Sequence, residues 1–234
     1  VKADGFDLVE DFSDLFGMND ANTDAKVRNT KEAILEAQFT PGAGNWCSWM
    51  FGRDLVNWNT NFTWAKWVTP SRDLINAFKK EGDEVRFKES VVYYDCSWSN
   101  YYPSDNYPFM YKCRSANSSI IKYRYADVLL LKAEALIMQD TPDLEAAAGI
   151  IDEIRKRAGL GKLPSSIREN KNSMIDALLK ERRLELAFEG QRWFDLVRLD
   201  KVEEVMNAVY AKDSGRKAQV YAFDKNSYRL PIPQ

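Results

Sequence analysis

The chain has 234 residues, with 33 basic and 35 acidic side chains and no histidine. Its net charge of -2 argues against a nucleic-acid protein that works by neutralising phosphates. The absence of histidine excludes Ser-His-Asp and Cys-His catalysis and every histidine-ligated metal site.

The three cysteines are Cys47, Cys96 and Cys113, an odd number that does not indicate a disulfide framework. Cys96 and Cys113 can pair in an oxidising compartment, and three unpaired thiols are the alternative. No run of about 18 apolar residues predicts a membrane span. The stretch after Val1 is polar and acidic, and we expect no signal peptide in it.

Residues 1–122 are rich in Trp, Tyr, Asn, Ser and Gly, which predicts short elements between long loops. Alternating apolar residues fit a strand or a short helix over 32–39. A long loop over 40–69 follows, and its five tryptophans argue against disorder. Ser71 then caps a helix that Gly82 ends. A strand is expected over 85–94, and a second aromatic loop over 95–117.

Residues 123–211 are dense in Ala, Leu, Glu, Lys and Arg, which are strong helix formers. The first helix is expected over 123–139, where the apolar residues at helical spacing are Val128, Leu131, Ala135 and Met138. Pro142 is expected to open a second helix that ends at Gly159. Small alanines at the contact make this helix pair resemble one tetratricopeptide unit.

Three more helices are expected after the pair. The first begins near Ser173 with a capping box and runs to Gly190, and the others cover 191–199 and 202–210. The prolines of the last residues fix an extended path for 230–233. The chain thus divides into a loop-rich aromatic part over 1–122, a helical part over 123–211 and a tail over 212–234.

Six runs of the sequence resemble the SusD/RagB family of outer-membrane, nutrient-binding lipoproteins, in the family's order. They are KEAILEAQF at 31–39, PSRDLINAF at 70–78, YRYADVLLLKAEA at 123–135, IRKRAGL at 154–160, ERRLELAFEGQRWFDLVR at 181–198 and LPIPQ at 230–234. The run at 181–198 is the most specific. The family's proteins are about twice as long, so the chain resembles their C-terminal half.

The resemblance implies a mainly α SusD-like fold, with tetratricopeptide-like helix pairs and a long-looped region with little strand. It implies a location at the cell surface, on the outer membrane, with a lipid anchor in an N-terminal region outside the matched portion. The partners that it implies are a glycan ligand, a SusC-like TonB-dependent transporter and the N-terminal half of the same protein.

The two aromatic loops are the predicted ligand site. A sugar ring presents an apolar face and a rim of hydroxyls, so flat rings beside Asn, Asp and Arg suit it. The alternative for any single tryptophan is a place in the core. We expect the glycan-binding residues among Trp46, Trp49, Arg53, Asp54, Asn57, Trp58, Trp64, Trp98, Tyr101 and Tyr102, and Asn45 and Tyr107 belong to the same loops.

The column Glu181, Glu185 and Glu189 is the one arrangement of carboxylates that suggests catalysis. Their spacing of four places them on one helix face, and such a column is far more often a solvated or ion-paired stripe. Arg192 and Asp195, three apart, are placed to pair on one face. The resemblance also implies a packing role for this run.

The sequence therefore predicts a non-catalytic protein that captures a glycan at the bacterial surface and delivers it to the transporter. No cofactor motif and no metal-spaced cluster is present, although a calcium site built from carboxylates and carbonyls stays open. The alternatives are a tetratricopeptide scaffold for peptides or proteins, a SusD-like binder of non-glycan cargo, and a glycoside hydrolase, which would need two carboxylates facing one cleft.

Overall fold

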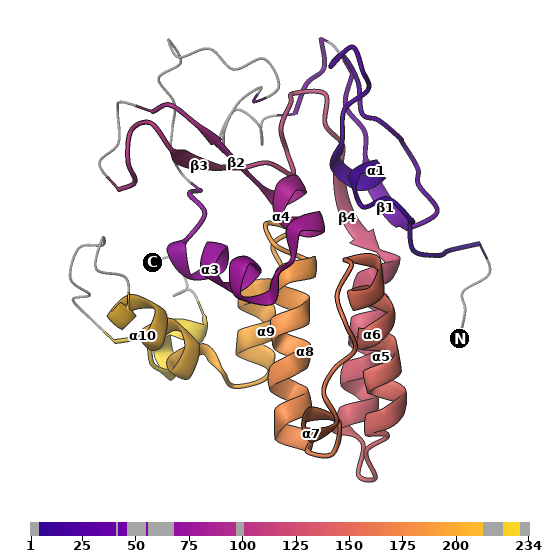
Figure 1. Cartoon of the computed structure of the whole chain (residues 1–234), viewed down its shortest axis with the longest axis vertical. Coiled ribbons are helices and arrows are strands. Elements are labelled where there is room, and N and C mark those ends of the chain that lie inside the picture. The colour runs from indigo at the N-terminus through magenta and orange to yellow at the C-terminus, as the bar shows by residue number, and fades with distance from the viewer. Residues whose placement is uncertain are drawn as a thin grey trace.

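The computed structural model describes residues 5–40, 42–45, 55, 68–96, 101–212 and 222–229. Figure 1 shows a head of short strands and loops above a body of upright helices. The C-terminal helix α10 lies to one side of the body. The head is built from the first half of the chain and the body from the second, as the change in composition predicts.

In the described residues, the head contains two small antiparallel sheets and three helices. One sheet pairs β1 with β4, and the other pairs β2 with β3. The bounds of these elements are α1 Ser13–Phe16, β1 Ala33–Ala37, α3 Arg72–Glu81, α4 Glu84–Ser90, β2 Val91–Tyr94, β3 Tyr107–Met110 and β4 Ile120–Arg124. The segment predicted as strand or helix over 32–39 is thus a strand, and its partner comes from the end of the first half of the chain.

Helix α3 forms as its sequence predicts. The Ser71 hydroxyl accepts a hydrogen bond from the backbone N–H of Leu74 at 3.1 Å, which caps the first turn. Gly82 ends the helix with φ of 71°, a left-handed conformation that favours glycine. Ile75 and Phe78 are the residues that α3 buries.

The strand predicted over 85–94 is wrong for most of its length. Asp83 caps a new helix, α4, and only Val91–Tyr94 form a strand. Val85 and Phe87 alternate with polar residues, which imitates a strand pattern. The residues that α4 buries are instead polar: Arg86, Glu89 and Ser90. The loop predicted over 95–117 likewise contains strand β3.

The body is a bundle of helices around an aliphatic core. Its elements are α5 Tyr125–Met138, α6 Leu144–Arg157, α7 Ser165–Arg168, α8 Lys171–Glu185 and α9 Arg192–Arg198, followed by α10 Val202–Lys212 and the short 3-10 turn η2 Lys225–Tyr228. Helices α5 and α6 form an antiparallel hairpin whose contact includes the buried Ala133, Ala147 and Ala148. Met174 and Leu178 of α8 complete this core.

Two helix starts differ from the prediction. Pro142 does not open α6, because Asp143 is the N-cap and its carboxylate accepts from the backbone N–H of Ala146 at 3.0 Å. Helix α8 begins before Ser173, since the Asn170 side chain caps it by accepting from the Ser173 N–H at 2.9 Å. Both caps use a short polar side chain just outside the first turn.

The apolar residues that predict α5 lie on its outer side. Val128, Leu131, Ala135 and Met138 are all exposed. The core side of the helix is made by other residues, Ala126, Leu129, Leu130, Ala133 and Ile137. Helix α5 is therefore apolar on two opposite sides, of which one is covered.

Several predictions concern residues outside the described ranges, among them the tail over 230–233 and most of the loop over 40–69.

Cys96 and Cys113 are not bonded to each other. The Cys113 thiol donates to Asn45 Oδ1 at 3.4 Å, and Cys96 is buried. Within the described part of the chain, the helices are too short or too polar to cross a bilayer.

Candidate functional site

The β2–β3 pair carries a series of aromatic rings through the head. Tyr94 lies opposite Tyr107 in the register of the two strands. Tyr107 and Phe109 are buried, with ring centroids 5.1 Å apart. From Tyr107 the series continues outward to Tyr102 at 5.6 Å and then to Tyr101 at 4.8 Å, with nearly perpendicular rings in both steps. Edge-to-face contacts of this kind stabilise aromatic clusters.

Hydrogen bonds fix the inner tyrosines of this series. The Tyr102 hydroxyl donates to the backbone carbonyl of Pro70 at 2.7 Å. The Tyr107 hydroxyl lies 2.9 Å from the Thr69 hydroxyl. Burial raises the pKa of the Tyr94 phenol, whose hydroxyl donates to the Leu55 carbonyl. The segment just before α3 therefore holds the rings in place.

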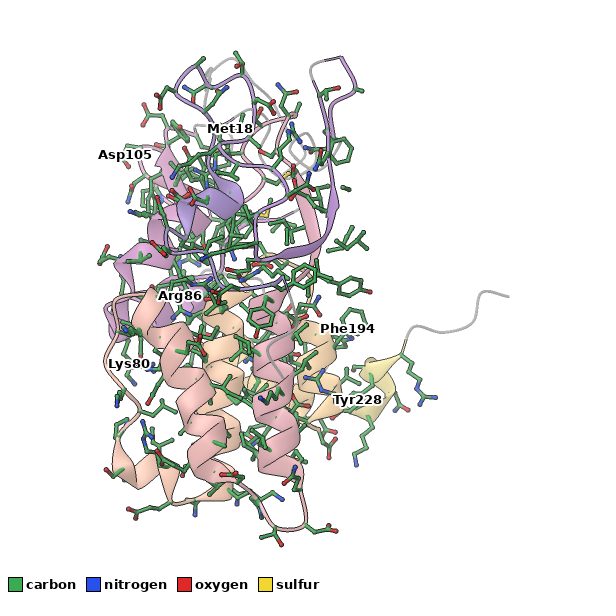
Figure 2. All side chains as sticks on the ribbon, turned by 90° about the vertical axis from the view of Figure 1, so that its right-hand side faces the viewer. Met18, Lys80, Arg86, Asp105, Phe194 and Tyr228 are labelled. Carbon is green, nitrogen blue, oxygen red and sulfur yellow. The ribbon has the colours of Figure 1, made fainter. Side chains whose placement is uncertain are left out.

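Arg72, the first residue of α3, completes the outer end of the series. Its guanidinium carbon lies 4.1 Å from the centroid of the Tyr101 ring and 4.6 Å from that of Tyr102. The same guanidinium donates to the Tyr101 carbonyl. Both tyrosines are half-buried. We call the group of Arg72, Tyr94, Tyr101, Tyr102, Tyr107 and Phe109 the aromatic cluster. Figure 2 shows all described side chains, with the head at the top.

The structure brings two of the predicted ligand residues together, Tyr101 and Tyr102. The other eight, Trp46, Trp49, Arg53, Asp54, Asn57, Trp58, Trp64 and Trp98, lie outside the described residues. Asn45 faces inward, since its amide donates to three backbone carbonyls of residues 115–118. Sequence reasoning missed Arg72. One signal in the sequence could have indicated it: Arg72 directly follows the helix cap Ser71, so it lies where the predicted aromatic loop over 40–69 meets the helix.

A set of charged side chains, linked by ion pairs, joins the head to the body. We call it the junction network. Its members are Glu32, Asp83, Arg86, Lys112, Arg124, Arg155, Arg157, Glu181, Glu185 and Glu189. They come from both halves of the chain.

Arg86 and Arg124 are the centres of the junction network. Arg86 pairs with Asp83 at 2.6 Å and with Glu181 at 2.6 Å. Arg124 pairs with Glu32 and with Glu189, each at 2.7 Å. All three carboxylates of the expected column are ion-paired, but only Glu181 and Glu185 lie on α8 and are buried. The helix ends at Glu185 and not at the predicted Gly190, so Glu189 lies in the turn that follows.

Charge and burial oppose each other in this network. Burial would raise the pKa of Glu185, but the guanidinium groups of Arg157, Arg124 and Arg86 outweigh it and hold the pKa well below its usual range. Burial lowers the pKa of the Lys112 ammonium to about 8, although Glu189 favours the charged form. The Lys112 nitrogen lies 2.6 Å from Glu189 and 4.6 Å from the centroid of the Phe16 ring.

The network offers no catalytic pair of carboxylates to a substrate. Glu181 and Glu185 are at most 1% exposed, and their oxygens are bound by arginines. A general acid or base must reach its substrate directly or through one water. The expected pairing of Arg192 with Asp195 is also not formed, because Asp195 pairs with Arg182 at 2.9 Å and with Arg198 at 3.0 Å. Arg192 donates to the Leu179 carbonyl instead.

The molecule is thus a mainly helical protein in which a bundle of helices supports a loop-rich aromatic head. The model of the SusD family matches residues 104–234, which is more than half of the chain. The chain belongs to the SusD family, as the six sequence runs predict. Among curated proteins, it is similar to SusD-like protein P38 of Formosa agariphila, with 43% identity over 99 residues. That match covers 40% of this chain and 19% of P38.

Solved structures share the fold. Surface glycan-binding protein A from Bacteroides uniformis is similar with a TM-score of 0.73 and 20% identity, over 99% of this chain and 50% of that one. Surface glycan-binding protein A from Bacteroides thetaiotaomicron, solved in complex with laminarihexaose, has a TM-score of 0.70 and 18% identity, over 99% and 54%. The chain therefore spans about half the length of these proteins, and it spans less of its curated relative.

Proposed function

We propose that this chain is part of a surface protein that captures glycans without chemical turnover, and that the aromatic cluster is a contact surface for sugar. The single observation that carries the proposal is the half-buried pair Tyr101 and Tyr102 with Arg72 against both rings. A ring fixed from behind loses little entropy when a ligand stacks on it. The relatives' names support the ligand class, since similar structures are described as glycan-binding.

The finer parts of the proposal rest on the family. The glycan passes from the captured state to a SusC-like TonB-dependent transporter in the outer membrane. A lipid anchor in the N-terminal half holds the protein at the cell surface, and that half packs with this chain through tetratricopeptide-like helices. The eight loop residues outside the described ranges, from Trp46 to Trp98, remain part of the proposed set of glycan-binding residues.

Affinity electrophoresis in gels cast with plant, host and microbial polysaccharides, laminarin included, tests the proposal. We expect at least one polysaccharide to retard the protein. Tyr101→Ala should weaken that binding by about tenfold, because a stacked ring contributes roughly 1 kcal/mol or more. Tyr228→Ala is the matched control: Tyr228 is also half-buried, and it bonds Asp200 far from the head (Figure 2).

The outcomes separate the parts of the proposal. Retardation that Tyr101→Ala leaves unchanged would remove the aromatic cluster from the site, and Trp46→Ala and Trp58→Ala would then be the next variants. Retardation by no polysaccharide, for the chain and for the longer polypeptide alike, would contradict a glycan ligand and favour peptide cargo. Release of shortened oligosaccharides during incubation would contradict the absence of turnover.

A further inference from the structure

A cavity of about 400 Å³ opens where helix α3 of the head meets the end of α8, α9 and α10. Figure 1 shows α3 above α10, on the same side of the body. We call this space the α3–α10 cavity. None of the described residues that line it belongs to the aromatic cluster or to the junction network. Its volume lies within the range of about 300–1,000 Å³ that is usual for small-molecule sites.

The walls of the α3–α10 cavity are mostly apolar. Four segments supply them: α3, the turn that follows α8, α9 and α10. The side chains that bear on the argument are Leu74, Phe188, Trp193, Met206 and Val209, and all five are half-buried. Walls of this kind take up the apolar body of a ligand, and a few polar groups then fix its orientation.

The charged groups of the cavity are arginines, and two of the three are neutralised by the protein. Arg182 pairs with Asp195 at 2.9 Å, and Arg183 pairs with Asp73 at 2.5 Å. Arg192 differs from both. In the part of the chain that the structure describes, no carboxylate lies within ion-pairing distance of its guanidinium.

Arg192 is therefore a cation that lacks a partner charge. Its guanidinium donates to the Leu179 carbonyl at 3.1 Å, and it lines the cavity. Burial and the nearby charge of Arg183 lower the pKa of Arg192 to about 10, so the group still carries its charge at neutral pH. Buried charges are normally paired. An anion in the cavity would supply the missing charge.

The shape of the guanidinium indicates which anion fits. Its planar fork can donate two parallel hydrogen bonds to a carboxylate. One unpaired arginine balances one negative charge, whereas a phosphate dianion would bring a second charge among apolar walls. The combination of a single free guanidinium and apolar walls thus favours a monocarboxylate over a phosphate ester or a neutral sugar.

We infer that the α3–α10 cavity is a binding site for a small organic carboxylate with an apolar body. The carboxylate binds Arg192, and the body packs against Leu74, Trp193 and the facing side chains of α10. This site goes beyond the proposed function, because its ligand is not a glycan and its residues are not those of the aromatic cluster.

Isothermal titration calorimetry with a matched pair of probes tests the inference. The probes are 2-naphthylacetate and 2-naphthylacetamide, which share the ring and differ in charge. We expect the carboxylate to bind at least tenfold more tightly than the amide at pH 7, because a hydrogen bond to a charged group contributes more than a neutral one. The same preference is expected in the longer polypeptide that includes the N-terminal half.

Two variants assign the binding to this cavity. Arg192→Gln should weaken binding of the carboxylate at least tenfold and that of the amide by less than about twofold. Arg229→Gln is its control, since it makes the same chemical change at an exposed arginine. Val209→Trp keeps Arg192 and fills the cavity from α10, so it should weaken both probes at least tenfold. Ala211→Trp, on the exposed side of α10, should change neither.

Several outcomes would overturn the inference. Binding of neither probe, or equal binding of both, would contradict an anion site. Binding that survives both Arg192→Gln and Val209→Trp would place the carboxylate elsewhere. Binding by this chain but not by the longer polypeptide would show that another segment fills the cavity. Polysaccharide retardation should be the same in Arg192→Gln as in the unchanged protein, so the glycan proposal succeeds or fails separately.

Discussion

The junction network and the aromatic cluster hold polar groups in opposite ways. In the network, Arg86 is fully buried and three carboxylates of the same chain surround it. In the cluster, Arg72 is only partly buried and lies against the faces of two tyrosine rings. The difference indicates where ligand chemistry is available. The charges of the network are paired inside the fold, whereas the rings of the cluster are half-exposed, and it is at these rings that we propose a ligand binds.

The contrast between the network and the cluster is tested most strongly by removing Arg86, a central arginine of the network. Arg86→Met leaves Asp83, Glu181 and Glu185 buried with one partner fewer, and breaking a buried ion pair costs about 3–5 kcal/mol. We expect that loss in the free energy of unfolding measured with urea. Lys79→Met on the exposed side of α3 is the control and should change it by less than about 0.5 kcal/mol. A loss below about 1 kcal/mol for Arg86→Met would contradict a structural role.

The pH dependence of Lys112 tests the same network. Burial lowers the pKa of Lys112 to about 8 in the folded protein, against about 10.4 in the unfolded chain. Between these values the unfolded state binds more protons, so stability rises with pH. We expect the stability of the protein relative to Lys112→Met to increase by about 1.6 kcal/mol from pH 8 to 9.5. Urea unfolding at each pH measures it, and a flat difference would contradict the shift.

The smallest expected effect lies in the aromatic cluster. Tyr102→Phe removes the hydrogen bond to the Pro70 carbonyl and keeps the ring, so stability should fall by about 0.5–1.5 kcal/mol. Because the ring contacts with Tyr101 and Tyr107 remain, glycan retardation should change by less than about twofold. A loss of binding as large as that of Tyr101→Ala would show that the hydroxyl position matters and that the cluster depends on the segment before α3.

Much of the fold follows from local signals in the sequence. Ser71 and Gly82 define α3, and helix formers with alanines at the contact predict the α5–α6 hairpin. The failures share a cause. Helix α4 buries Arg86 and Glu89, and α5 exposes Val128 and Leu131, so the hydrophobic pattern predicts the wrong element for α4 and the wrong face for α5. Partners distant in the sequence decide which residues these helices bury, and a local pattern cannot contain them.

The candidate site is less predictable than the fold. Loop composition points to Tyr101 and Tyr102, because aromatic residues among polar ones suit a sugar surface, and their role in binding stays a prediction. It does not separate these from Tyr107, which is buried in the same loop region. Arg72 contacts the Tyr101 ring because the start of α3, at residues 71–72, packs against the loop at 101–102. Such a meeting is set by tertiary packing, which neither composition nor spacing encodes.

The junction network also sets an order of events during synthesis. Glu32 bonds Arg124, which lies 92 residues later, and Arg157, which lies 125 residues later. At about 5–20 residues per second, Arg157 leaves the ribosome roughly 6–25 s after Glu32. Strand β1 therefore waits without its partner strand β4 while the rest of the head is made, and Glu32 waits for Arg157 until α5 and α6 have been made. Arg86 and Arg124 of the head gain their last carboxylate partners later still, when Glu181, Glu185 and Glu189 have been made, so a nascent chain that ends earlier would expose an unfinished head to proteases and chaperones.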